Sequence, residues 1–142
     1  MADAVVMEVR GLGVLLRRID KAPVRKLANE ALTESTKAVH KRLSEYTQTK
    51  PPKPSGSTYI RTFILKDSVQ FNIKPFGTSG EGRVYTGLDY APYVIGHENQ
   101  ATIHMGRWWT EKSVADEMMP VVVSYFSDAL DKVARLIAGG II

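Results

Sequence analysis

Three histidines are the side chains of this sequence best suited to acid–base or metal chemistry, because the chain contains no cysteine. His97 is followed directly by Glu98, and His104 comes seven residues after His97. Two histidines and one carboxylate can hold a transition metal, so a metal-assisted hydrolase is one hypothesis. The spacing differs from the zinc-protease pattern, in which two histidines lie four residues apart on one helix. His40 falls in a helical pattern and is expected to be structural.

Other catalytic patterns are missing from the sequence. Neither Ser68 nor Ser113 lies between glycines after a strand, as the nucleophile of a serine hydrolase would. The glycine-rich stretch 77–82 lacks the lysine of a phosphate-binding loop and precedes a predicted strand, so it is interpreted as a hairpin turn. We therefore expect a protein that is not an enzyme and needs neither a cofactor nor a metal.

A concentration of aromatic side chains between residues 90 and 109 is the most distinctive chemical feature. Such residues combine a large apolar area with a polar group and are enriched in interface hot spots. The candidates for a subunit interface are Tyr90, Tyr93, Arg107, Trp108 and Trp109. The alternative interpretation is a local core cluster that anchors a long loop against the C-terminal helix, and the sequence leaves both open.

The formal net charge is +4, and its surplus lies in the N-terminal third. Clustered Lys and Arg can bind nucleic acid by releasing counterions from phosphates, so a basic nucleic-acid-binding module is a further alternative. The basic residues are interspersed with Glu30, Glu34 and Glu45, however, which is typical of a solvated helix face. They are Arg17, Arg18, Lys21, Arg25, Lys26, Lys37, Lys41 and Arg42.

The elements that must position these residues begin with helices. Apolar residues between 24 and 43 recur every three or four positions, which predicts a long amphipathic helix over 21–47. Pro23 suits its first turn, and Asp20 is a suitable N-cap. A short helix is predicted before it, around residues 12–19.

A proline-rich connector over 49–57 is predicted to end the long helix, because proline lacks the backbone N–H. A sheet is expected over 58–105. Val69, Phe71 and Ile73 alternate with polar residues, as in a half-buried strand, and 83–88 is predicted to return antiparallel to it. A further strand is indicated at 102–104.

The last third is predicted to be a helix over 110–138. Thr110 or Ser113 can cap its start, and Gly139 and Gly140 are expected to end it. Pro120 is expected to bend or break the helix into a first piece at 111–119 and a second at 120–137.

Together these elements predict one α+β domain over residues 1–142, with helices at 1–48 and again at the C-terminal end. A small antiparallel sheet with a long hairpin would pack against two long helices. No apolar run reaches the length of a membrane-spanning helix, and the N-terminus lacks the pattern of a signal peptide. Helices on one side only would leave strand edges and an apolar sheet face for another subunit.

The order of motifs from Pro51 to Leu136 resembles the tail-completion, or head–tail joining, proteins of long-tailed bacteriophages, in the group that includes minor tail protein Z. A proline-rich connector precedes the stretches Thr58-Tyr-Ile-Arg-Thr62 and Leu65-Lys-Asp-Ser68, and a hairpin follows. Next come Tyr90-Ala-Pro-Tyr-Val94, Ile103-His-Met-Gly-Arg-Trp-Trp109 and a closing helix.

This resemblance implies a structural virion protein at the phage head–tail junction, made in the bacterial cytoplasm and found in the neck or tail of the particle. It also implies a homo-oligomeric ring, with a hexamer as the expected form. Its neighbours would be head-completion, tail-terminator or tail-tube proteins, and DNA would pass through the ring without sequence-specific binding. No membrane association is expected.

Overall fold

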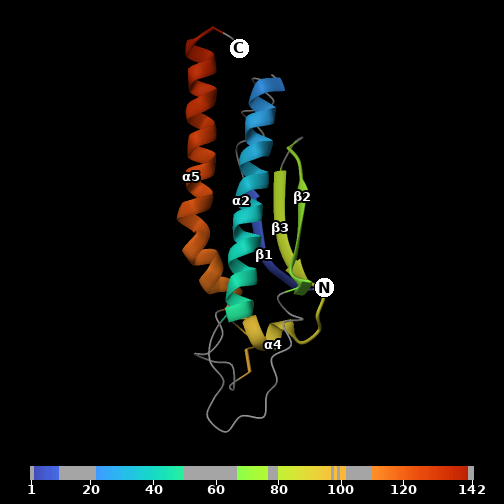
Figure 1. The fold of residues 1–142 in the computed structure, drawn as a ribbon. Coiled ribbons are helices and arrows are strands. Elements are labelled where there is room, and N and C mark those ends of the chain that lie inside the picture. The colour runs from blue at the N-terminus through green and yellow to red at the C-terminus, as the bar shows by residue number, and fades with distance from the viewer. Residues whose placement is uncertain are drawn as a thin grey trace.

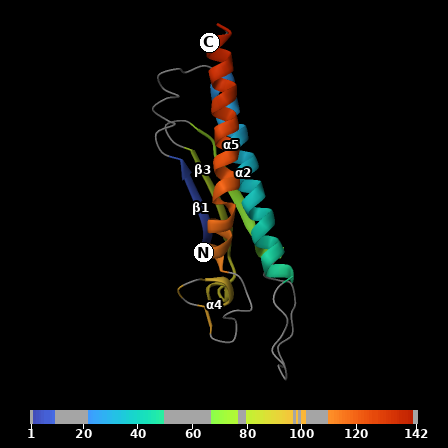
Figure 2. The ribbon, with the colours of Figure 1, turned by 90° about the vertical axis from the view of Figure 1, so that its left-hand side faces the viewer.

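The computed structural model describes residues 2–9, 22–49, 67–76, 80–96, 98, 100, 101 and 110–140. Within them the chain adopts the predicted α+β fold. The elements are β1 (Ala2–Val9), α2 (Ala22–Thr49), β2 (Gln70–Lys74), β3 (Gly80–Thr86), α4 (Ala91–Ile95) and α5 (Glu111–Ala138). Figure 1 shows the two long helices side by side, with α2 between α5 and the sheet. Figure 2 shows α5 in front of α2, with β1 to the left of α5 in this view.

Helix α2 confirms the prediction of a long amphipathic helix, with bounds two residues or fewer from those expected. Its regularly spaced small and branched residues face the sheet and α5. The two polar residues on this face, Ser35 and Thr36, are fully buried, and each hydroxyl donates to a backbone carbonyl one turn earlier, at 2.7 Å. The hydrogen bonds remove the cost of burying these hydroxyls. The buried apolar residues are Val24, Ala28, Ala31, Leu32, Val39 and Leu43.

The predicted hairpin is confirmed, since β2 and β3 pair antiparallel with Phe71 opposite Val84. The sheet has a third strand, because β1 pairs antiparallel with the other edge of β3 in the order β1-β3-β2. The expectation that residues 1–48 hold only helices is therefore wrong for β1. Its run of alanine and valine has the composition of a strand, but eight residues without strict alternation carry little periodic signal.

One further expectation is wrong, and another is wrong in part. The region 58–105 is not all sheet, since α4 lies within it. Pro120 does not divide the last helix, since α5 runs from Glu111 to Ala138 with Pro120 inside it. A proline removes one hydrogen bond to the preceding turn, and burial of Val114 and Met118 on one side of the proline and Val133 on the other holds the helix together. The helix does bend, since in Figure 1 the first turns of α5, in orange, run at an angle to the rest.

The ends of α5 agree with the sequence. The Thr110 side chain accepts a hydrogen bond from the backbone N–H of Ser113 at 3.2 Å, and Gly139 closes the other end by donating to the Arg135 carbonyl at 2.9 Å. The predictions of a short helix at 12–19, of the connector beyond Thr49 and of a strand at 102–104 concern residues outside the described ones.

Among the described residues, two apolar clusters form the core. The first lies near the α4 end of the molecule and joins all layers: Val39, Leu43, Val69, Val84, Ala91, Val94, Ile95, Val114 and Met118. The second lies towards the opposite end: Val24, Ala28, Leu32, Phe76 and Val133. Each cluster contains residues of α2, of α5 and of the segments around the hairpin, so the two helices cannot separate without opening both.

Candidate interaction surface

The first two candidate interface residues are Tyr90, which directly precedes helix α4, and Tyr93, which lies within it. This helix is a single turn, in which the Tyr93 N–H donates to the Tyr90 carbonyl at 3.0 Å. Ala91 and Val94 point into the core, whereas Tyr90 is 43% exposed and Tyr93 58% exposed. The turn therefore separates the small apolar residues of this motif from its aromatic residues, and both tyrosines of the motif face outward.

The chain after α4 returns to hold this turn in place. The Ala101 N–H donates to the Tyr93 carbonyl at 2.7 Å, and the Gln100 side-chain amide donates to the Val94 carbonyl at 2.7 Å. These bonds satisfy carbonyls at the C-terminal end of α4, which one helical turn leaves without intrahelical partners. The two tyrosines consequently sit on a fixed turn.

The other three candidates, Arg107, Trp108 and Trp109, lie outside the described residues. The same holds for His97 and His104 of the hypothetical metal site, while Glu98 is described and exposed. Among the described residues, no group of His, Cys, Asp or Glu could hold a metal ion.

His40 has the structural role that its helical context predicted. Its Nε2 lies 2.9 Å from the carbonyl oxygen of Val69, and its ring meets the Phe71 ring edge-on with centroids 5.1 Å apart. The imidazole thus joins α2 to the start of β2 through one hydrogen bond and one aromatic contact.

Among the described residues, most of the exposed large apolar side chains lie along α5, and this surface was missed from the sequence. Four side chains of this helix are about half exposed: Met119 (59%), Val123 (56%), Leu130 (47%) and Ile137 (51%). They recur at helical spacing beside a second set that packs on α2. Periodicity alone indicates a wide apolar sector, and it cannot tell which half of the sector another element covers.

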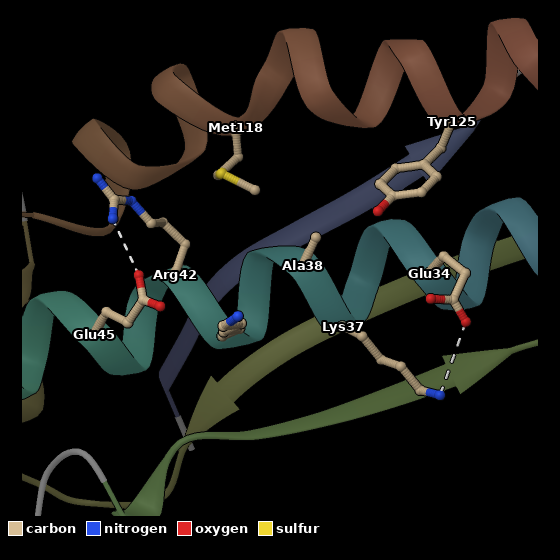
Figure 3. A pocket seen from close by; sticks show the side chains of 8 residues that line it. Glu34, Lys37, Ala38, Arg42, Glu45, Met118 and Tyr125 are labelled. Atoms are coloured by element: carbon tan, nitrogen blue, oxygen red, sulfur yellow. Dashed lines mark hydrogen bonds and ion pairs between the residues drawn. The ribbon is translucent and has the colours of Figure 1, made fainter.

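A groove with a volume of about 440 Å³ runs between α2 and α5 on the side away from the sheet, as Figure 3 shows. Ala38, Met118 and Tyr125 form its apolar part. At one end the Arg42 guanidinium donates to Glu45 at 3.0 Å and to both carboxylate oxygens of Glu117 at 2.9 and 3.3 Å. This arginine therefore ties the two helices together.

Basic residues of α2 alternate with acidic ones, as expected for a solvated helix face. Lys26 pairs with Glu30 at 3.9 Å, and Lys37 pairs with Glu34 at 4.0 Å. Exposed pairs of this kind contribute little stability, but they neutralise the positive charge of the face locally.

The sheet face away from the helices is polar in its described part, contrary to the expected apolar face. β3 alternates strictly, so Val84 and Thr86 are buried while Glu81, Arg83 and Tyr85 lie on the other side. Register places polar β2 residues beside them. The Arg83 guanidinium donates to Glu81 at 3.0 Å, and Lys74 lies 3.6 Å from the same carboxylate. The exposed apolar surface is on α5 instead.

This arrangement predicts a titration that can be measured. The hydrogen bond from Arg83 is the main reason that the pKa of Glu81 lies below its ordinary value of 4.5, and the charges of Arg83 and Lys74 lower it further while desolvation opposes them. Because the folded-state pKa is lowered, the pair stabilises the fold above the unfolded-state pKa. That contribution is lost as the pH falls through the folded-state pKa.

We expect Arg83→Gln to move the Glu81 pKa upward, towards its ordinary value, in an NMR titration of the side-chain carboxyl carbon. Lys112→Gln, at an exposed pair on α5, is the control and should leave the Glu81 pKa where it is. An unchanged Glu81 pKa in Arg83→Gln would show that this contact does not control the titration.

Comparisons with known proteins add no family to this description. A scan against protein-family models found no match, and searches of curated proteins and of solved structures found none either. No helix in the described part of the chain is long and apolar enough to cross a membrane.

Proposed function

We propose that this chain is a structural protein of the phage head–tail junction, a component of the neck or tail-completion ring that joins or terminates the tail. The observation that carries the proposal is the pair of exposed tyrosines, Tyr90 and Tyr93, on a turn that a packed core fixes in place. A protein that exposes large apolar side chains on rigid elements is suited to assembly with other subunits.

The order of motifs in the sequence supports the same proposal. Tyr90-Ala-Pro-Tyr-Val94 is its most specific element, and in the structure this motif exposes both tyrosines while its alanine and its valine are buried. Rigid exposed tyrosines bring contact area at low cost in conformational entropy. The fold, helices packed on a small antiparallel sheet, is of the kind that the resemblance implies.

In this proposal the chain forms a homo-oligomeric ring, with six copies as the expected number, in the neck or tail of the virion. Its neighbours are head-completion, tail-terminator or tail-tube proteins, and DNA passes through the ring without being read in sequence. The chain takes no direct part in a chemical reaction.

The proposal is tested on particles purified from cells that carry the intact gene, beside particles from a strain with an early stop codon and a complementing plasmid. Mass spectrometry should find the chain in complete virions, and cryo-electron microscopy should place it as a ring between head and tail. The stop-codon strain should accumulate separate heads and tails, and the plasmid should restore joining. Complete, infectious particles that lack the chain would refute the proposal.

A further inference from the structure

Six apolar residues of α5 follow one another at intervals of four, three, four, three and four positions. At about 3.6 residues per turn, this spacing places them on one straight stripe of the helix. The same alternation of three and four marks the seam between two helices that pack along their length. The stripe consists of Met119, Val123, Phe126, Leu130, Val133 and Ile137.

The members of the stripe differ in how far their side chains are buried. Val123 and Leu130 are about half exposed and protrude, whereas Val133 is 7% exposed and Phe126 packs against the second core cluster. Protruding and recessed side chains therefore alternate along its centre, and Met119 and Ile137 protrude at its two ends.

Charged residues are kept away from the stripe. Between Met119 and Ile137 the charged side chains of α5 are Asp128, Asp131, Lys132 and Arg135. At about 100° per residue, each lies at least roughly 80° around the helix from the nearest member of the stripe. Covering the stripe with another apolar surface would therefore bury none of these charged side chains.

We propose that the stripe binds the α5 helix of a second copy of this chain, with the two helices antiparallel about a twofold axis at the level of Asp128. The intervals read the same in both directions, so Met119 meets Ile137 of the second copy, and Val123 meets Val133 of the second copy. Phe126 meets Leu130 of the second copy in the same way. Each protruding central residue thus lies over a recessed one, which is the complementarity that a twofold interface requires of a single surface.

The exposed area of the stripe indicates the affinity with which two copies bind each other. Four half-exposed apolar side chains per copy, with their neighbours, would bury on the order of 1,000 Å² in total, at the low end of specific interfaces. We therefore expect a pair that forms and dissociates with concentration. The inference concerns the purified chain alone and does not rest on the proposed function.

The first test is sedimentation equilibrium from about 5 to 500 μM, a range that brackets the micromolar affinity expected of a small interface. The wild type should shift from monomer to dimer across this range. Val123→Glu should weaken the association at least tenfold, because it places a charge in the seam. Val121→Glu is the matched control, since Val121 is also exposed but lies on another side of the helix, and it should associate as the wild type does.

Each variant should keep the wild-type helical circular dichroism and melting temperature, because both side chains are exposed. A wild type that stays monomeric at the highest concentration would overturn the proposal. So would an oligomer that Val123→Glu and Val121→Glu affect equally.

The second test uses the absence of native cysteine, which makes any introduced thiol unique. In the antiparallel pair, Met119→Cys and Ile137→Cys should form a disulfide with each other when the two variants are mixed, and neither should cross-link with itself. Two copies of residue 119 would lie about 27 Å apart along the axis, at about 1.5 Å per residue, well beyond the reach of a disulfide. Self-linked Met119→Cys would indicate a parallel pair and contradict the proposed geometry.

The rate of Met119→Cys alkylation identifies any other occupant. A monomer with a slowly reacting thiol would mean that another part of the same chain covers the stripe. A monomer with a fast-reacting thiol would mean that the surface serves a different protein. Either result overturns the proposal of a second copy.

Discussion

Leu32→Ala is expected to lower the free energy of unfolding by roughly 3–4 kcal/mol, the typical sum of lost transfer energy and cavity formation for a buried leucine. Leu32 is fully buried in the second cluster, where it lies with Phe76 and Val133. The melting temperature should fall by roughly 10 °C for a chain of this size. Urea unfolding followed by circular dichroism, at a protein concentration of a few micromolar to limit self-association, measures the change.

Leu130→Ala is the matched control, because it makes the same substitution in a helix at a side chain that is 47% exposed. It should change the stability by less than about 1 kcal/mol, as surface substitutions usually do. Equal losses in the two variants would contradict the burial of α2 against α5 described above. Leu130→Ala should nevertheless weaken self-association, which separates the role of this leucine from that of Leu32.

Gly80→Ala is expected to have the next largest effect, a loss of roughly 1–3 kcal/mol, as is typical when a packed core receives extra volume. A Cβ atom at Gly80 would lie 2.6 Å from Cε1 of Phe76, closer than any ordinary contact between carbon atoms. The ring has no easy way to move, since Phe76 is buried among α2 and α5 side chains and its backbone N–H donates to Asn29 at 2.7 Å.

Two variants make this result specific. Gly87→Ala should be nearly neutral, because no atom lies within 4 Å of a Cβ placed there. Phe76→Leu removes Cε1 and Cζ, two of the three ring atoms that would collide, so Gly80→Ala should cost less in that background. Additive effects in the double variant would show that the clash with Phe76 is not the cause.

Much of the fold could be predicted from the sequence because its signals are local. The positions of α2, of the hairpin and of the ends of α5 follow from periodicity and capping residues that act within a few positions of one another. Thr110 and Gly139 illustrate this, since each bonds to backbone only three or four residues away. Strand β1 was missed, because its stability comes from pairing with β3, more than 70 residues later in the chain.

The candidate site could be predicted only in part. The aromatic motif at Tyr90 and Tyr93 was identified from residue type, but its outward orientation depends on the single turn of α4 and on the return of Ala101 to the Tyr93 carbonyl. The expected apolar sheet face is polar in its described part. The alternation of residues in β3 could be read from the sequence. The sequence did not show which of the two alternating sets faces the helices.

The sequence by itself determined that the chain builds long amphipathic helices and an antiparallel hairpin, since these depend on patterns within single segments. Only the tertiary structure decided that Pro120 stays within one helix and that α2 covers one half of the apolar sector of α5. The physical reason is that a side chain becomes buried only when another element packs against it, so burial cannot be read from one segment alone. Met119, Val123, Leu130 and Ile137 are as apolar as the residues of the core, and they are exposed only because no described element lies over them.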